Sequence, residues 1–237
     1  MTNGRKIPGL RALGAASTAV WLSLTAAPGA AESQAVRILA FGDSLVHGYG
    51  LATQDSFPVQ LERALRDAGH PVEVLNGGNS GDTTAAGLAR LDWALSDRPD
   101  LAIVELGGND GLRGIDPEET YRNLDAILTR LAADDIPVLF TGMLAPRNLG
   151  ADYADAFDAV FPRLAAAHGV AFYPFFLDGV AMRPELNQPD GIHPNAAGVA
   201  RVVERILPSV VRLIESYETR GSESRSGETP NAEAGDG

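Results

Sequence analysis

Four short polar blocks in this sequence hold the residue types that could do chemistry. They are bounded by glycine or proline and cover residues 42–45, 77–83, 107–111 and 190–194. Ser44 lies in the first block on a glycine-flanked turn, a position that suits a nucleophile. A serine hydroxyl attacks only when a base removes its proton, and histidine suits this task because its pKa lies near working pH. The first block therefore predicts nucleophilic catalysis by Ser44.

The fourth block supplies the base. His193 follows Asp190 by three residues, so the aspartate can accept a hydrogen bond from one ring nitrogen and fix the tautomer. Acyl transfer also needs donors for the developing oxyanion. The backbone N–H groups of Ser44 and Gly81 and the side-chain amide of Asn109 are suitable. The blocks predict a Ser44–His193–Asp190 triad with these three oxyanion donors.

A glycine-rich turn with serine or aspartate is by itself more typical of a helix cap than of catalysis. Four such blocks in order, with one His–Asp pair among them, favour catalysis. Asp43 and Asp82 are expected to act as caps or braces, and Asp110 to order its loop. His47 is a rival base, but no acid lies near it in the sequence.

The elements between the blocks alternate between strand and helix. Short, nearly continuous apolar runs predict strands at 36–41, 72–76, 101–106, 138–141 and 170–173. The segments between them have helical period, which predicts a parallel sheet covered by helices on both faces. In such sheets the site lies at the carboxyl ends of the strands, where the four blocks fall.

Local signals refine the helices. Asp116, Pro117 and Glu119 predict a helix start, and Pro162 and Pro208 predict a bend or kink in the last two helices. Trp93 is expected in the core.

The four blocks resemble those of the SGNH, or GDSL, hydrolase family. Within it they are most similar to periplasmic multifunctional esterases of the thioesterase I, lysophospholipase L1 and arylesterase type. The resemblance rests on residues 80–83, 104–114, 174–176 and 190–194 and spans about residues 36–216.

This resemblance implies a three-layer α/β/α flavodoxin-like fold with a five-stranded parallel sheet. It assigns the catalytic residues to Ser44, Asp190 and His193. It also implies a small-molecule or lipid-like ester substrate, namely an aryl ester, acyl thioester or lysophospholipid, and no cofactor or metal.

Three residues are candidates for substrate binding. Gly111 and Leu112 belong to the segment 111–115, which is either a substrate lid, as the resemblance suggests, or a polar connection. His47 follows Ser44 by three residues, where close relatives tend to carry a small residue, and is expected to narrow the acyl pocket. Arg147 either borders the acyl groove or faces water.

Composition excludes several classes of function. The 237 residues include no cysteine, which rules out disulfides and a cysteine nucleophile, and the formal net charge of −12 argues against nucleic-acid partners and anionic membranes. Two other functions stay open. One is a carbohydrate or cell-wall O-acetylesterase on the same fold, and the other is a non-catalytic exported binding protein.

The two ends differ from the middle. Residues 1–31 show a basic, apolar and small-residue order that predicts a signal peptide cleaved after Ala31, or alternatively after Ala35. The rival interpretation is an uncleaved anchor. A hydrolase domain is expected at 32–217 and a disordered acidic tail at 218–237. The mature protein is expected to be periplasmic or secreted, without stable membrane insertion.

Overall fold

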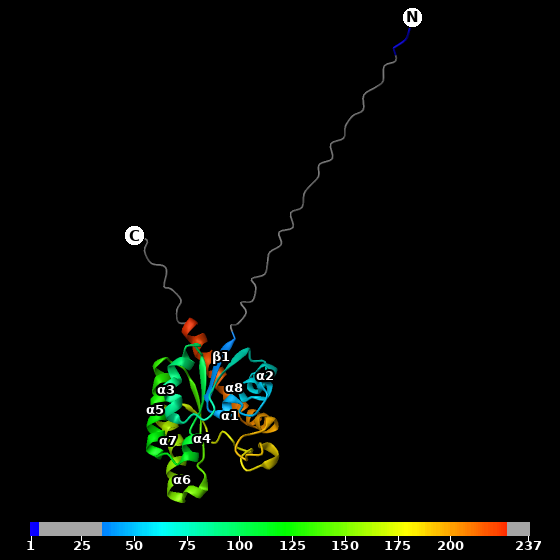
Figure 1. Ribbon diagram of the computed structural model, residues 1–237. Helices are drawn as coiled ribbons and strands as arrows, with labels where there is room; N and C mark the ends of the chain where they lie inside the picture. The colour runs from blue at the N-terminus through cyan, green and yellow to red at the C-terminus, as the bar shows by residue number, and fades with distance from the viewer. Residues whose placement is uncertain (5–34, 227–237) are drawn as a thin grey trace, which may run out of the picture. The chain divides into compact units, whose positions relative to one another are not determined.

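A five-stranded parallel sheet forms the middle layer of the fold (Figure 1). The computed structural model describes residues 1–4 and 35–226, with side chains in the last helix as far as Glu223. In spatial order the strands are β2, β1, β3, β4 and β5, which is the flavodoxin-like order that was expected. Their bounds are Val36–Gly42 (β1), Val72–Gly78 (β2), Leu101–Glu105 (β3), Val138–Thr141 (β4) and Ala171–Tyr173 (β5).

The register of the sheet brings three strand ends to one level. Gly42 at the end of β1 pairs with Gly78 at the end of β2 and with Glu105 at the end of β3. Both β1 and β3 are almost wholly buried, because helices cover the two faces of the sheet. The polar segments that follow these three strands therefore begin side by side at the carboxyl edge.

Helices cover both faces of the sheet (Figure 1). On one face α2 (Phe57–Asp67) packs against α8 (Ala196–Ser226). On the other, α5 (Pro117–Ala133) packs against both α3 (Thr84–Leu95) and α7 (Val160–His168). Shorter elements complete the chain: α1 (Ser44–His47), α4 (Gly108–Arg113), α6 (Ala151–Asp158), and the 3-10 turns η1 (Thr53–Asp55), η2 (Arg147–Leu149) and η3 (Pro184–Leu186).

The start of α5 follows its sequence signals. The side chain of Asp116 accepts a hydrogen bond from the backbone N–H of Glu118, and Pro117 occupies the first helical position. A proline fits there because its missing N–H has no partner within the helix anyway.

The bend expected at Pro162 was misplaced. The chain forms two helices, α6 and α7, which are separated at Ala159. Pro162 lies in the first turn of α7, where the lack of an N–H leaves no helical hydrogen bond unmade. The proline therefore marks the start of a helix rather than a bend inside one.

The placement of Trp93 in the core was also wrong. Its side chain is 72% exposed. The buried face of α3 carries Gly87, Leu91 and Leu95, and Trp93 is two residues from Leu91, which places it on another face of the helix.

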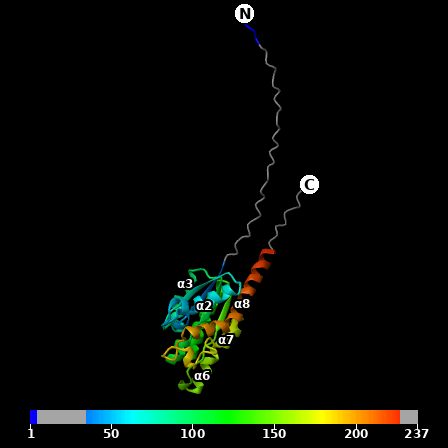
Figure 2. The same cartoon turned by 90° about the vertical axis from the view of Figure 1, so that its right-hand side faces the viewer.

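Helix α8 is longer than expected (Figure 2). Pro208 lies inside it. It continues to Ser226, so the boundary that put a disordered tail at 218 was wrong, and residues 227–237 lie outside the described part. A helix already fixed by buried side chains extends at little further cost, because nucleation is the unfavourable step. The hydroxyl groups of Thr219 and Ser222 also donate to carbonyls of the preceding turn, at 2.8 and 2.7 Å.

The predicted signal peptide lies almost entirely outside the described residues, since residues 5–34 are not among them. Within 1–4 and 35–226, no helix is both long and apolar enough to cross a membrane.

Candidate active site

Ser44, His193 and Asp190 form one chain of hydrogen bonds at the carboxyl edge of the sheet. Nε2 of His193 lies 2.9 Å from Oγ of Ser44, and Nδ1 lies 2.7 Å from a carboxylate oxygen of Asp190. With a proton on Nδ1 held by Asp190, Nε2 is free to accept the proton of the serine hydroxyl. This arrangement can activate Ser44 as a nucleophile.

The loop before α8 orients the acid and the base together. Asp190 accepts hydrogen bonds from the backbone N–H groups of Ile192 (2.9 Å) and His193 (3.0 Å) through the carboxylate oxygen that does not bind the ring. These bonds, led by those from His193, lower the pKa of Asp190 from 3.8 to about 2. Asp190 therefore stays ionised well below neutral pH.

The turn from β1 to α1 positions Ser44. The side chain of Asp43 caps this short helix by accepting the backbone N–H of Leu45 at 3.0 Å, as expected for a capping residue. Ser44 is the first residue of α1, so its N–H has no acceptor within the helix. Gly42 allows the close approach of the strands here, because a Cβ would lie 2.6 Å from both the backbone carbonyl and a carboxylate oxygen of Glu105.

Asn109 comes from α4, which follows β3. Gly107 precedes this helix with a φ of +115°, a conformation that side chains disfavour, and a Cβ there would lie 2.9 Å from Phe161. The Asn109 amide donates to a carboxylate oxygen of Asp43 at 3.1 Å and to the carbonyl of Asp82 at 3.0 Å. It therefore lies next to the Ser44 turn.

Gly81, the third expected oxyanion donor, lies in the turn before α3. It has a φ of +87°, and its N–H has no hydrogen-bond acceptor among the described residues. Its neighbour Asp82 contacts Asn109, so the segments that carry the expected donors are adjacent.

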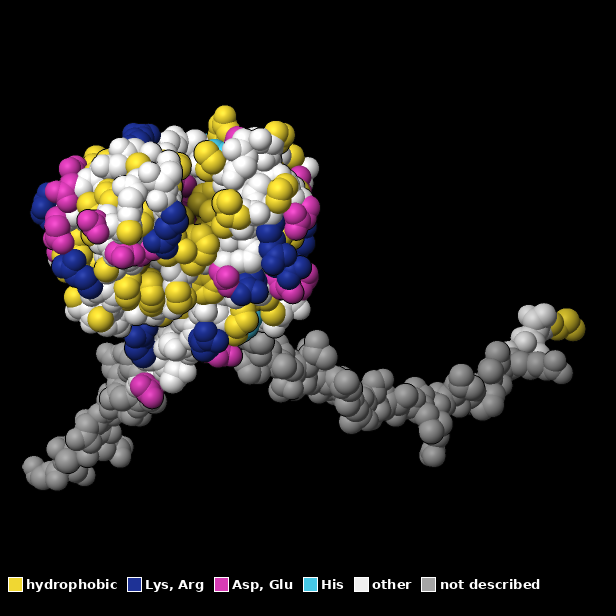
Figure 3. All heavy atoms as spheres, turned by 90° about the horizontal axis from the view of Figure 1, so that it is seen from below, with side chains coloured by type: hydrophobic (Ala, Val, Ile, Leu, Met, Phe, Trp, Pro, Cys, Tyr) yellow, Lys and Arg dark blue, Asp and Glu magenta, His cyan; other side chains and the backbone are white. Residues whose placement is uncertain are grey.

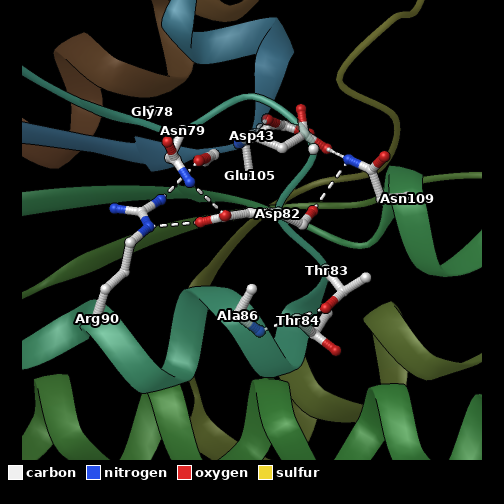
Figure 4. Close-up of polar contacts among 12 residues, drawn as sticks. Asp43, Gly78, Asn79, Asp82, Thr83, Thr84, Ala86, Arg90, Glu105 and Asn109 are labelled. Atoms are coloured by element: carbon white, nitrogen blue, oxygen red, sulfur yellow. Dashed lines mark hydrogen bonds and ion pairs between the residues drawn. The ribbon is translucent and has the colours of Figure 1, made fainter.

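Asp82 and Asp110 brace the loops, as expected. Arg90 reaches from α3 to the carboxylate of Asp82, which also accepts the amide of Asn79 (Figure 4). Asp110 is buried and accepts both the backbone N–H and the hydroxyl of Thr84. These contacts hold the turn after β2 against α4.

Two buried acids shape the electrostatics of the site. Burial raises the pKa of Asp43 from 3.8 to about 6, although hydrogen bonds from Leu45 and Asn109 oppose the shift. Burial, and after it the charge of Asp43, raises the pKa of Glu105 well above its ordinary value.

An apolar cavity of about 480 Å³ opens at Ser44, and Figure 3 shows hydrophobic side chains gathered around a hollow in this face. Ser44, Asn109 and His193 line it together with Asp43 and Arg147. Its apolar wall comes from several loops: Leu45, Leu112, Met143, Leu144, Ala145, Pro146, Phe175, Leu177, Ala181, Met182 and Ile192. The cavity can hold an apolar group next to the serine hydroxyl.

The structure brings only one of the three expected substrate-binding residues to the cavity. Leu112 lines it and is 49% exposed. Gly111 is buried, and a Cβ there would meet Phe157 at 3.3 Å, so it faces the packed interior. His47 is exposed at the end of α1 and does not line the cavity. The segment 111–115 is not a free loop, because its first three residues belong to α4.

Several residues at the site were not anticipated. Tyr49 places its ring 4.7 Å from that of His193, and the Gln188 amide donates to the carbonyls of Tyr49 (2.7 Å) and Pro194 (3.0 Å). Glu105 belongs to the segment 104–114, and its sequence signal is a charged residue at the end of an otherwise apolar strand.

No group of three or more His, Asp or Glu side chains within residues 1–4 and 35–226 is arranged to hold a metal ion.

Comparison with known proteins places these features in context. A sequence profile of the GDSL-like lipase/acylhydrolase family matches residues 40–201, which contain Ser44, Asn109 and His193. The "Arylesterase" of Vibrio mimicus is 37% identical over 197 residues, covering 83% of this chain and 96% of that protein. The "Thioesterase 1/protease 1/lysophospholipase L1" of Escherichia coli (strain K12) is 40% identical over 159 residues, covering 67% of this chain and 75% of that protein.

Solved structures also resemble this chain. The crystal structure of AlinE4, an SGNH-hydrolase family esterase, matches with a TM-score of 0.65 and 49% sequence identity. The match covers 76% of this chain and 97% of that one.

Proposed function

The chain belongs to the GDSL-like lipase/acylhydrolase family and is a serine hydrolase of ester and thioester bonds, and on that premise we propose an exported esterase that works through an acyl-enzyme. One observation carries this proposal. The hydrogen-bonded chain from Asp190 through His193 ends at Ser44, which lines an apolar cavity.

The first half-reaction acylates the serine. Oγ of Ser44 attacks the acyl carbon while Nε2 of His193, 2.9 Å away, takes the hydroxyl proton. Asp190 stabilises the imidazolium that forms. The carbonyl oxygen becomes an oxyanion, which accepts hydrogen bonds from the N–H groups of Ser44 and Gly81 and from the amide of Asn109. The imidazolium then gives its proton to the leaving alcohol or thiol.

The second half-reaction releases the acid. Water replaces the leaving group, and His193 takes a proton from it as it attacks the acyl carbon of the Ser44 ester. A second oxyanion forms at the same donors. Its collapse returns the proton to Oγ of Ser44 and frees the carboxylic acid.

The lining of the cavity points to acyl groups longer than acetyl. Its wall is mostly apolar, and burying each methylene contributes about 0.8 kcal/mol. The relatives are named as an arylesterase and as a thioesterase and lysophospholipase. We therefore propose aryl esters, acyl thioesters and lysophospholipids as the substrate range.

The two alternatives fit less well. An O-acetylesterase acting on carbohydrate needs a polar cleft for sugar hydroxyl groups, whereas the wall here is apolar. A non-catalytic binding protein has no need for a serine, histidine and aspartate held at hydrogen-bond distance.

A chain-length series tests the proposal. With p-nitrophenyl and CoA esters, kcat/KM should rise by up to about fourfold per added methylene until the cavity is filled. Ser44→Ala should be inactive and should not form an acyl-enzyme visible by mass spectrometry. Highest activity on acetyl esters, with loss at each longer chain, would favour the O-acetylesterase.

A matched pair of variants localises the acyl site. Leu144 lines the cavity and is 42% exposed, whereas Leu149 is 39% exposed and is not part of the lining. Leu144→Ser should flatten the rise with chain length and leave acetyl ester hydrolysis nearly unchanged. Leu149→Ser should behave as the wild type, and equal effects from both would place the acyl chain elsewhere.

A further inference from the structure

Glu105 and Asp43 are two buried carboxylic acids next to the turn that carries Ser44. Glu105 closes β3 with no exposed surface, and Asp43 follows β1 and is 1% exposed. A carboxylate oxygen of Glu105 lies 3.4 Å from the backbone nitrogen of Asp43. Neither acid takes part in the transfer of a proton from Ser44 to His193.

In the described part of the chain, no cation forms an ion pair with either acid. Arg90 comes to the same turn, but its guanidinium binds the carboxylate of Asp82 and the carbonyl of Gly42 (Figure 4). The nearby His193 ring lowers the pKa of Asp43, but after burial the hydrogen bonds from Leu45 and Asn109 have the larger effects. On α4, Asp110 is bound by the hydroxyl groups of Thr84 and Thr120. The carboxyl groups of Asp43 and Glu105 are buried next to each other with no cation between them, so they cannot both stay ionised.

The hydrogen bonds decide which acid keeps the proton. Asp43 accepts the backbone N–H of Leu45 at 3.0 Å and the amide of Asn109 at 3.1 Å, both of which stabilise a carboxylate. Glu105 receives one long backbone contact, from the N–H of Asp43, and its Oε1 has no partner among the described residues. Its side-chain hydrogen bond to the Asp43 carboxyl raises the pKa of Glu105 and lowers that of Asp43, as expected when Glu105 is the donor. Burial also raises the pKa of Glu105 well above 4.5, so the negative charge lies on Asp43.

Asp43 links this pair to the oxyanion donor. The amide nitrogen of Asn109 carries two hydrogens, and its two acceptors are Asp43 and the carbonyl of Asp82. An oxyanion must therefore compete with one of these two acceptors for a hydrogen, and only Asp43 carries a charge that can change the strength of its bond. A second negative charge on Glu105 would repel the oxyanion and strengthen the bond between Asp43 and Asn109.

We propose that Glu105 is a positioning residue whose proton limits the Asp43–Glu105 pair to one negative charge and so leaves Asn109 available to the oxyanion. This inference rests on the esterase mechanism proposed above. It assigns the alkaline limit of catalysis to Glu105. Activity then falls at the pH at which Glu105 ionises, because the pair then carries two negative charges.

Glu105→Gln tests the proposal, because glutamine keeps the size of the side chain and cannot ionise. Near neutral pH its kcat/KM should stay within about threefold of the wild-type value. At alkaline pH the wild type should lose up to about tenfold per pH unit, and the variant should not. Glu73→Gln, at an exposed ion pair on β2, is the matched control and should keep the wild-type profile.

Thermal unfolding of the same full-length chains gives a readout that needs no substrate. Between its unfolded and folded pKa values, Glu105 binds more protons in the native state than in the unfolded state, so wild-type stability falls as pH rises. Glutamine has no such titration. The melting temperature of Glu105→Gln relative to wild type should therefore increase from about pH 5 upward, and Glu105→Met should show the same trend.

The two readouts separate this proposal from the proposed function. An unchanged alkaline decline in Glu105→Gln, or a melting difference that does not vary with pH, would overturn the role of the Glu105 proton. Absence of esterase activity in the wild type would overturn the proposed function and with it the catalytic role of Glu105. The melting series would then still show whether Glu105 holds the proton.

Discussion

At the scale of single residues, the candidate site depends on groups that are oriented by other groups. Asp190 is held by two backbone N–H groups while it holds the imidazole, and the imidazole in turn meets Ser44. Asn109 is held by Asp43 and by the carbonyl of Asp82. Conservative substitutions at Asp190 and Asn109 should therefore change rates without changing the fold.

Asp190→Asn should keep the fold and lower kcat by on the order of 10⁴-fold, because an amide no longer stabilises the imidazolium or fixes its tautomer. Steady-state kinetics with one p-nitrophenyl ester will measure the loss. Retention of most of the activity would remove Asp190 from the mechanism.

The lowered pKa of Asp190 also predicts how the stability of the folded protein changes at acidic pH. The pKa of Asp190 is lowered in the folded protein from 3.8 to about 2, so its contribution to stability is complete above the unfolded value. It is lost as pH falls from about 4 toward about 2. The difference in melting temperature between wild type and Asp190→Asn should be constant above about pH 5 and should shrink below it. A difference that persists unchanged at about pH 2 would contradict this assignment.

Asn109→Ala should lower kcat by about 10²–10³-fold with little change in KM, because one oxyanion donor acts mainly in the transition state. Asn123→Ala is a useful control, since that amide donates to Thr84 rather than to the site turn. A loss confined to KM would place Asn109 in substrate binding instead.

At the scale of elements, the sheet register and two loops place the site. The ends of β1, β2 and β3 are level, which puts the turns that carry Ser44, Gly81 and Asn109 side by side. The loop that carries His193 is joined to the turn after α1 by the Gln188 amide, which donates to carbonyls on both sides. Helix α8 continues past its packed part without contributing to the site.

Removal of residues 220–237 should leave both activity and melting temperature nearly unchanged. The buried side chains of α8 end at Leu213 and Ile214, and the side chains of 218–220 are exposed. Differential scanning fluorimetry and an ester assay on the truncated chain will check this. A midpoint lowered by several degrees would mean that the removed residues pack against the domain.

At the scale of the whole molecule, residues 35–226 form one packed unit, and the segment with the signal-peptide pattern precedes them in the sequence. The formal charge of −12 argues against nucleic acids and anionic membranes as partners, and a chain without cysteine forms no disulfide. We propose that the mature protein works in the periplasm or outside the cell.

Export predicts a mature N-terminus at Glu32, after the small residues Ala30 and Ala31. Intact-mass analysis of the protein purified from its native host will measure this end. Cleavage after Ala35 would also support export. It would remove Ala35, which is the first described residue of the packed unit. A chain that begins at Met1 or Thr2 would contradict the cleaved signal.

Much of the fold was readable from the sequence, because local patterns report local structure. Five nearly continuous apolar runs predicted the five strands, of which β1, β3 and β4 are buried and the edge strands β2 and β5 are partly exposed. The polar blocks between them predicted the edge at which the site lies. The errors arose where tertiary context outweighs a local signal. Pro162 starts a helix, Trp93 is exposed, and α8 continues beyond Tyr217 on the strength of its packed turns.

The sequence by itself determined which residue types were available and in what order, and therefore the triad of Ser44, His193 and Asp190 as a hypothesis. Only the tertiary structure decided that Leu112 reaches the cavity while Gly111 and His47 do not. Only the folded chain also brings Glu105 next to Asp43, with no cation paired to either acid among residues 1–4 and 35–226. The physical reason is that burial and contacts across 62 residues of chain depend on three-dimensional packing, which no local pattern of residues encodes.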